Sequence, residues 1–361
     1  MSVPQAWKDW TSLGKTQSSG SLNRVSVWDG WRGMAIILLL IGHFFDQKWI
    51  WEDRLGVDAF FVLSGMLMST ILFEKRMNLK DFYIRRFSRI FPAFSLYVIV
   101  IFTLSLLARL LFDREELTFE GKEFISTLTF FRTYIPLDPH IWATKIPIGH
   151  LWSLNVEEHA YVIMSIMTLF ILRNTNAAYV LIALGLISIG ICFYYFHNIS
   201  APTHFRIRTE SAISFVFLSA GYNLIKNKYN IKVPSVLPII TLILAFLCYF
   251  EDPSVNTRSL WIPELSFSLA PILLAFTLNH ITEAHIIIRG ILEFKIIRLI
   301  GTWSFSIYLW QQPFYSYSWA VPGGKPVAVV LAILAGIVSF YIFENPIRTW
   351  INNRWTKNTS N

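Results

Sequence analysis

An arginine and a histidine at a fixed helical spacing are the first residues in this sequence whose types could carry chemistry. Arg32 and His43 lie eleven residues apart in the run WDGWRGMAIILLLIGHFF. On an α-helix, eleven steps of about 100° end about 20° past three turns, so both side chains leave nearly the same face, about 16 Å apart along the axis. Ionisable groups inside apolar helices are costly, so we predict a catalytic role for His43. The alternatives are a topological anchor for Arg32 and an interhelical hydrogen bond for His43.

Three arginines open a later apolar run, FYIRRFSRIFP. Arg85, Arg86 and Arg89 place at least two guanidinium groups on one helical face. The planar forks of arginine suit phosphate oxygens, and a coenzyme A donor would bring phosphates from the cytoplasm. We therefore predict a phosphate site here, with contact to anionic lipids as the alternative.

Carboxylates follow at three further places. Glu157 and Glu158 begin an apolar helix in HLWSLNVEEHAY, where one can interact with the helix dipole and the other can orient a histidine. Asp58 in GVDAFFVLSG and Glu344 in FYIFENP are weaker candidates. Asp58 is expected to start a helix or to orient His43, and Glu344 to pair with a cytoplasmic arginine.

Long apolar runs must position these residues. Of the 361 residues, 54% are hydrophobic and 15% charged, against about 25% charged in an average soluble domain, which excludes an ordinary soluble enzyme. A bilayer crossing takes about 20 apolar residues, and the sequence predicts an all-α, polytopic membrane bundle of about ten transmembrane helices. The candidate spans are roughly 31–50, 55–73, 90–111, 149–172, 177–197, 210–225, 235–250, 260–281, 296–319 and 325–344.

The distribution of charge sets the expected topology. With the N-terminus in the cytoplasm, alternate connections on that side hold 20 of the 31 Lys and Arg residues, against 11 on the other, as the positive-inside rule requires. We expect a polar cytoplasmic tail over 1–24, a membrane domain over 25–347 and a cytoplasmic tail over 348–361. The net charge of +8 then reflects topology, and we expect no nucleic-acid partner.

Neither the cysteines nor the histidines indicate a metal. Cys192 and Cys248 both lie inside apolar runs, and the histidines are scattered. We therefore expect no metal site.

Six segments together resemble the acyltransferase 3 family of polytopic membrane acyltransferases, which includes O-antigen acetylases and other bacterial cell-surface carbohydrate O-acyltransferases. The resemblance extends from residue 28 to residue 348, nearly the whole chain, with the Arg-x10-His spacing intact. The segments, in order, are WDGWRGMAIILLLIGHFF, GVDAFFVLSG, FYIRRFSRIFP, GHLWSLNVEEHAY, LIGTWSFSIYLWQQPFY and YIFENPIR.

The resemblance implies roles for particular residues. It makes His43 catalytic, with Arg32 as its companion, and Gln311 occupies a position where the family often has histidine, so a hydrogen-bonding role is expected there. Some members carry a fused extracytoplasmic esterase-like domain, which we do not expect within these residues. The remaining motif positions fall on Arg85, Arg86, Arg89, Trp152, Ser153, Glu157, Glu158 and Glu344.

The expected function is that of an acyltransferase in the bacterial inner (plasma) membrane. It would transfer an acyl group, with acetyl expected, from cytoplasmic acetyl-CoA or another acyl-CoA to a hydroxyl of a cell-surface or lipid-linked carbohydrate. The partners expected are acyl-CoA, this sugar acceptor and membrane lipids. A transporter or exporter of a lipid-linked or small anionic substrate is the alternative, because it would also need buried charge.

Overall fold

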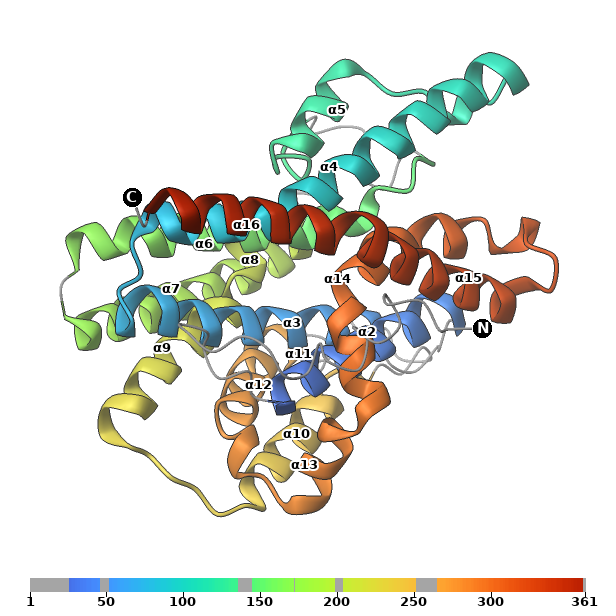
Figure 1. The fold of residues 1–361 in the computed structure, drawn as a ribbon. Helices are drawn as coiled ribbons and strands as arrows, with labels where there is room; N and C mark the ends of the chain where they lie inside the picture. Colours follow the sequence, from blue (N-terminus) through green and yellow to red (C-terminus); the bar gives the residue numbers. More distant parts are fainter. Residues whose placement is uncertain are drawn as a thin grey trace, which may run out of the picture.

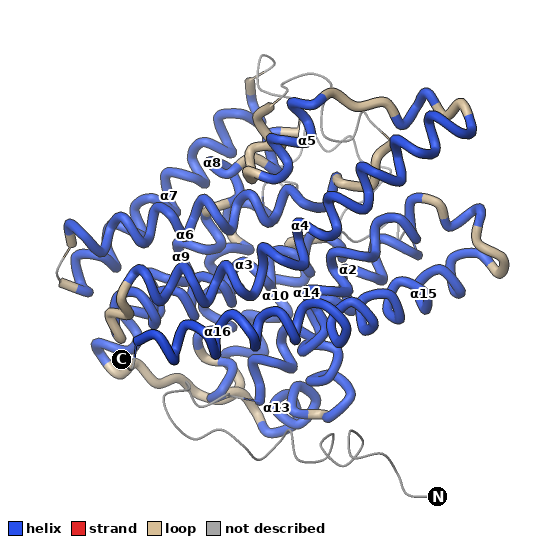
Figure 2. The backbone as a smooth tube through the Cα atoms, turned by 45° about the horizontal axis from the view of Figure 1, so that its top comes forward, coloured by secondary structure: helices blue, strands red, loops and turns tan. Residues whose placement is uncertain are grey.

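The computed structural model describes residues 26–45, 52–135, 145–171, 173–198, 204–250 and 265–359. Regular structure within these ranges is helical (Figures 1 and 2), so the all-α prediction is confirmed there, and each of the ten candidate spans contains helix. The main elements are α2 (Ser26–Phe45), α3 (Glu52–Ser69), η1 (Thr70–Glu74), α4 (Leu79–Phe112), α5 (Gly121–Leu128), η3 (Gly149–Leu151), α6 (Trp152–Phe170), α7 (Asn174–His197), α8 (Thr209–Ala212), α9 (Ser214–Tyr229), α10 (Leu237–Leu247), α11 (Leu265–Ser268), α12 (Ala270–Asn279), α13 (Ile286–Glu293), α14 (Lys295–Ser316), α15 (Gly324–Ser339), η9 (Phe340–Glu344) and α16 (Asn345–Thr359).

Within the described residues, four helical segments are long and apolar enough to cross a membrane. They are Asp53–Glu74, Leu79–Phe112, Asn174–His197 and Gly324–Trp355, and two shorter apolar helices lie at Leu237–Leu247 and Ala270–Asn279. The sequence predicted about ten crossings. The other candidate spans are not among these four segments, because their helices are short or carry polar side chains. The full count of crossings and the cytoplasmic N-terminus stay predictions.

The longest helix, α4, begins and ends at identifiable signals. The Asn78 side chain caps its first turn by accepting a hydrogen bond from the backbone N–H of Lys80 at 2.8 Å. Asp113 then ends the helix in a left-handed conformation, with φ of 52°. The second half of α4 extends beyond the other helices, accompanied by α5 (Figure 1).

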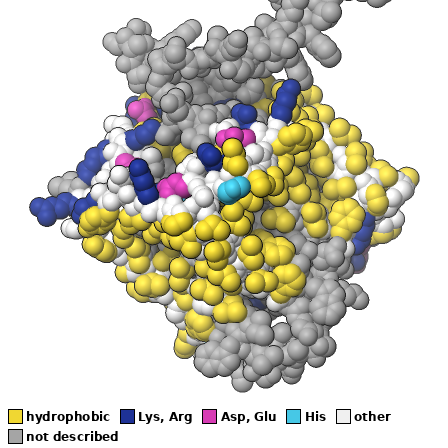
Figure 3. All heavy atoms as spheres, turned by 90° about the horizontal axis from the view of Figure 1, so that it is seen from below, with side chains coloured by type: hydrophobic (Ala, Val, Ile, Leu, Met, Phe, Trp, Pro, Cys, Tyr) yellow, Lys and Arg dark blue, Asp and Glu magenta, His cyan; other side chains and the backbone are white. Residues whose placement is uncertain are grey.

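This extended half is coated with apolar side chains. Leu110, Leu111 and Phe112 are 66%, 69% and 73% exposed. On the face seen from below, hydrophobic side chains cover most of the described surface and charged side chains gather in one area (Figure 3). Apolar surface of this extent is typical of contact with lipid, which agrees with a membrane protein.

Residues predicted as a cytoplasmic tail, 348–361, are helical as far as Thr359. They continue α16, which packs along α4 (Figure 2). The indole N–H of Trp355 donates to a carboxylate oxygen of Asp81 at 2.8 Å, and the Lys80 ammonium lies 4.5 Å from the Trp355 ring centroid. Trp355 on α16 therefore stabilises the first turn of α4, the helix that carries the arginine cluster.

Helices α2 and α14 pack backbone against backbone. A Cβ atom added at Gly33 would lie 2.0 Å from the carbonyl oxygen of Ile297, and one at Gly301 would lie 1.9 Å from that of Asp29. Glycine permits such an approach because no side chain separates the helices. Ten residues further along each helix, His43 meets Gln311 at 3.0 Å. The two helices therefore run parallel, because the glycine contact and the His43–Gln311 contact are separated by the same rise, about 15 Å, along each helix.

We predict that Gly301→Ala destabilises the protein by about 1–3 kcal/mol, because the added methyl group overlaps a backbone carbonyl that cannot rotate away. The midpoint of thermal unfolding of the purified protein in lipid nanodiscs measures the effect. Gly290→Ala is the matched control, since a Cβ there meets nothing within 4 Å. Equal midpoints for the two variants would contradict the close packing of α2 on α14.

Candidate functional site

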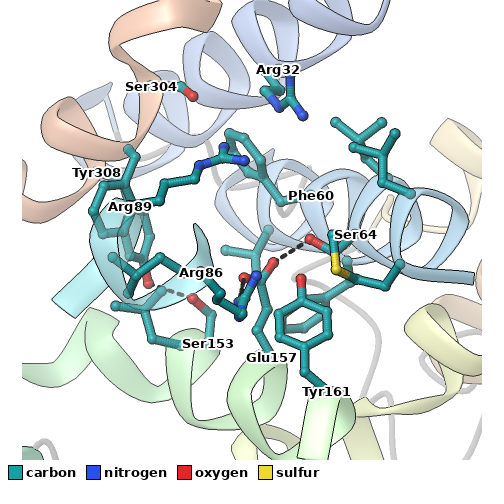
Figure 4. Close-up of a pocket in the computed structure, with 18 residues that line it drawn as sticks. Arg32, Phe60, Ser64, Arg86, Arg89, Ser153, Glu157, Tyr161, Ser304 and Tyr308 are labelled. Atoms are coloured by element: carbon teal, nitrogen blue, oxygen red, sulfur yellow. Dashed lines mark hydrogen bonds and ion pairs between the residues drawn. The ribbon is translucent and has the colours of Figure 1, made fainter. Parts of the chain in front are cut away.

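A cavity of about 90 Å³ lies where α2, α3, α4, α6 and α14 meet (Figure 4). Each of these helices carries one of the segments singled out in the sequence, so the fold brings together residues as far apart in the chain as Arg32 and Tyr308. The walls are mainly apolar. The polar residues that line the cavity are Arg32, Ser64, Arg86, Arg89, Ser153, Glu157, Tyr161, Ser304 and Tyr308.

One side of the cavity is cationic. The Arg32 and Arg89 side chains face it from α2 and α4 (Figure 4). Arg32 forms an ion pair with Asp29 at 3.0 Å. Arg89 is exposed and has no ion pair within 4 Å in the described part of the chain, but it interacts electrostatically with Glu344. Arg85 is also exposed and does not line the cavity. Of the predicted arginine cluster, Arg86 and Arg89 therefore line the cavity and Arg85 does not.

Arg86 is already balanced by both predicted glutamates. Its guanidinium group lies 2.8 Å from Glu158 and 3.4 Å from Glu157, and 3.4 Å from the centroid of the Tyr161 ring. The Ser64 hydroxyl donates to the other carboxylate oxygen of Glu157 at 2.6 Å. Arg86 thus joins α4 to α6 while it lines the cavity, and its role as a phosphate ligand stays a prediction.

His43 is held by Gln311 on α14. Imidazole Nδ1 lies 3.0 Å from Gln311 Oε1, and because an amide oxygen only accepts, the proton is assigned to Nδ1. The other nitrogen, Nε2, keeps its lone pair and lies 3.7 Å from Asp53. The Tyr315 ring is 4.5 Å from the imidazole, centroid to centroid. The predicted hydrogen-bonding role of Gln311 is thus seen in the structure.

The predicted carboxylate partners of His43 lie elsewhere. Glu157 contacts Ser64 and Arg86, as described above. Asp58 is fully buried and accepts hydrogen bonds from Arg54 at 3.0 Å and from the Tyr249 hydroxyl at 2.8 Å. The expectation that either acid orients His43 is therefore corrected. Within the described residues, Asp53, five residues before Asp58, is the acid that forms a pair with the imidazole, and its position at the start of α3 did not mark it in the sequence.

Glu344 and Trp152 have supporting contacts. Glu344 is buried, accepts a hydrogen bond from Ser306, and lies 3.9 Å from Arg348, so the predicted arginine partner is present. The Trp152 ring lies under the Arg54 guanidinium group at 4.8 Å. These residues join helices around the cavity rather than lining its cationic side.

A second histidine was missed in the sequence. His150 is 2% exposed, and its backbone N–H and its imidazole Nδ1 both donate to Gln312 Oε1. The Tyr308 hydroxyl donates to the backbone carbonyl of His150, and the Ser153 hydroxyl lies 2.6 Å from the Tyr308 hydroxyl. The signal was available, because His150 directly precedes the LWSLNVEE segment.

The arrangement has two chemically distinct parts. Cationic donors at Arg32 and Arg89 suit an anionic group, and an imidazole with a free lone pair lies about 16 Å further along α2. Among the described residues, no group of three or more His, Cys, Asp and Glu side chains could hold a metal ion. The site can therefore bind an anionic ligand at one end and accept a proton or an acyl group at the other.

Comparison with known proteins identifies relatives over almost the whole chain. The acyltransferase 3 family model, described as an acyltransferase domain, matches residues 25–345. A Staphylococcus aureus (strain COL) protein whose name provisionally assigns it as an O-acetyltransferase is 28% identical over 89% of this chain and 56% of its own length. The O-acetyltransferase OatA of S. aureus (strain NCTC 8325) is 25% identical over 94% of this chain and 59% of its own length.

The chain thus spans a little over half the length of these curated relatives. No solved structure gives a significant match. The matched range includes every helix that contributes to the cavity.

We predict that Arg86→Gln lowers stability by about 3–5 kcal/mol, because it leaves two carboxylates facing each other without their shared cation. Thermal unfolding in nanodiscs measures this loss, and Arg86→Gln combined with Glu158→Gln should recover part of it. Arg114→Gln is the control, since the Arg114–Glu116 pair is exposed and contributes at most about 1 kcal/mol. A midpoint for Arg86→Gln as high as that of the control would argue against the structural role.

Proposed function

The chain belongs to the acyltransferase 3 family, and from this premise we propose that it is a membrane O-acyltransferase. It transfers an acetyl group from cytoplasmic acetyl-CoA to a hydroxyl group of a cell-surface or lipid-linked carbohydrate. One observation carries the proposal. Arg89 shares a cavity with Arg32, and His43 follows Arg32 on α2, with Nε2 directed away from Gln311 and 3.7 Å from Asp53.

The donor binds from the cationic side. Coenzyme A carries a 3′-phosphate and a diphosphate, which suit the guanidinium groups of Arg89 and Arg32. Arg85, which is exposed near the cavity on the same helix, meets the nucleotide outside it. A cavity of about 90 Å³ is too small to enclose the nucleotide, so only part of the pantetheine arm enters it. The rise of about 16 Å from Arg32 to His43 is a distance that an extended pantetheine arm covers.

His43 then acts on the acceptor. In the direct route, Nε2 takes the proton of the acceptor hydroxyl while the oxygen attacks the thioester carbonyl; the carbon–sulfur bond then breaks, and the imidazolium returns the proton to the departing thiolate of coenzyme A. Asp53, 3.7 Å from Nε2, stabilises the imidazolium ion that forms. In the covalent route, Nε2 attacks the thioester carbonyl and the carbon–sulfur bond breaks to release the thiolate of coenzyme A. The acceptor oxygen then attacks the acyl-imidazole, the bond from Nε2 to the acyl carbon breaks, and the hydroxyl proton balances the charge of the thiolate.

The two routes differ in one observable. A labelled acetyl group that stays on the protein in the absence of acceptor, and is lost in His43→Ala, supports the covalent route. Label that persists in His43→Ala places the acyl carrier elsewhere.

The acceptor is the least constrained part of the proposal. The names of the staphylococcal relatives specify O-acetyl transfer, which supports a hydroxyl acceptor. We expect the outer connection before His150 to influence acceptor choice, and residues 136–144 of it lie outside the described residues. Exchanging this connection between relatives should change acceptor preference if it makes the choice.

We predict that His43→Ala lowers acyl transfer by about 10²–10⁴-fold, the contribution typical of a general base. Mass spectrometry of surface polysaccharide checks this in cells that lack the gene and carry either the wild-type or the variant copy. The acetylated species should return only with the wild-type copy. An identical acyl pattern in all three strains would contradict a carbohydrate acceptor.

We predict that Arg89→Gln raises the KM for acetyl-CoA by roughly 10- to 100-fold, because a hydrogen bond to a charged group contributes about 1.5–3 kcal/mol. Release of free thiol from acetyl-CoA by membranes that contain the protein gives the KM. Arg109→Gln, at the far end of α4 in an exposed position, is the charge-matched control. An unchanged KM for Arg89→Gln would place the phosphates elsewhere.

A further inference from the structure

His150 is attached to α14 at two points within one helical turn. Its backbone N–H and imidazole both donate to Gln312, and its backbone carbonyl accepts from Tyr308. These three hydrogen bonds are buried, since His150 is 2% and Gln312 5% exposed. Buried hydrogen bonds of this kind are costly to break because their partners would stay unsatisfied. The orientation of this turn of α14 is therefore tied to residue 150.

The same turn of α14 contacts both the cavity proposed for the donor and the imidazole of His43. Tyr308 lines the donor cavity, and Gln311 holds His43 at 3.0 Å. Side chains of adjacent residues on a helix are about 100° apart, so a rotation that moves Gln312 moves Gln311 equally. Displacement of Gln312 would thus shift the amide oxygen that keeps the proton of His43 on Nδ1.

We propose that His150 is a positioning residue for acyl transfer, which acts through Gln312 and Gln311 to keep Nε2 of His43 unprotonated and correctly aimed. This inference rests on the proposed function. It assigns no reaction step to His150 itself, because Nε2 of His150 is buried and has no hydrogen-bond partner, and only Nδ1 and the backbone make the contacts that matter.

This role distinguishes His150 from a residue that merely fills space. A side chain with an N–H donor at the place of Nδ1, such as that of asparagine, should restore the contact to Gln312, whereas alanine should not. If His150 acts through Gln311, the effects of removing the two side chains should overlap instead of adding.

The test is a mutant cycle on membranes from expressing cells, with acetyl-CoA as the probe and free thiol and acetylated product as readouts. We expect His150→Ala to lower kcat on the order of 10- to 100-fold, the effect of a misplaced catalytic group, with the KM for acetyl-CoA almost unchanged. His150→Asn should recover most of kcat. His150→Ala combined with Gln311→Ala should be no slower than Gln311→Ala alone.

His280→Ala is the control for loss of a buried imidazole, since His280 contacts Tyr222 and Glu283 instead of this site. It should leave kcat per folded molecule unchanged. If His150→Ala fails to fold, Gln312→Ala removes the same hydrogen bonds from the other side and takes its place in the cycle.

Three results would overturn the inference: kcat of His150→Asn as low as that of His150→Ala, multiplicative losses in the double variant, or an unchanged kcat in both His150→Ala and Gln312→Ala. Failure of the proposed function is distinguishable, because the wild-type membranes themselves would then release thiol without forming an acetylated product, or release none.

Discussion

The close packing of α2 on α14 is the constraint on which the site depends. Gly33 and Gly301 bring the two backbones together near one end, and His43 meets Gln311 near the other. Because the helices run parallel with equal spacing between these contacts, the depth of His43 is set by the glycine contact about 15 Å away. A shift of one helix along the other would separate the histidine from its hydrogen-bond partner. The packing of α2 on α14 therefore places the Gln311 amide oxygen beside Nδ1 of His43.

The charges around the cavity divide into structural and available groups. Arg86, Glu157 and Glu158 neutralise one another between α4 and α6, and Arg54 does the same for Asp58. An ion in low-dielectric surroundings must be paired to be tolerated, so these residues join helices. Arg89 is exposed, so water can solvate its charge, and Glu344 is the acid on which it acts electrostatically. Arg32 is paired with Asp29 of its own helix. The cationic side of the cavity thus consists of charges that do not join α4 to α6.

Much of the fold was predictable. Apolar runs indicated helices, and helices are found at all ten candidate spans, because apolar length and composition are local properties of the chain. The site was predictable in part. The eleven-residue spacing placed Arg32 and His43 on one helix, and Gln311 was expected to form a hydrogen bond. The carboxylate beside His43 is not one of the two expected, since Asp53 carries no local pattern and is brought near the imidazole only by helix packing.

The sequence by itself determined the class of protein, the helices and the set of residues from which the site is built. These properties depend on composition and on spacing within a helix, where the geometry of 3.6 residues per turn is known in advance. Only the tertiary structure decided which arginine joins two helices through ion pairs and which acid faces the histidine. Those outcomes depend on distances of a few ångströms between residues that are distant in sequence, and neighbouring arginines such as Arg86 and Arg89 differ only in what another helix places beside them.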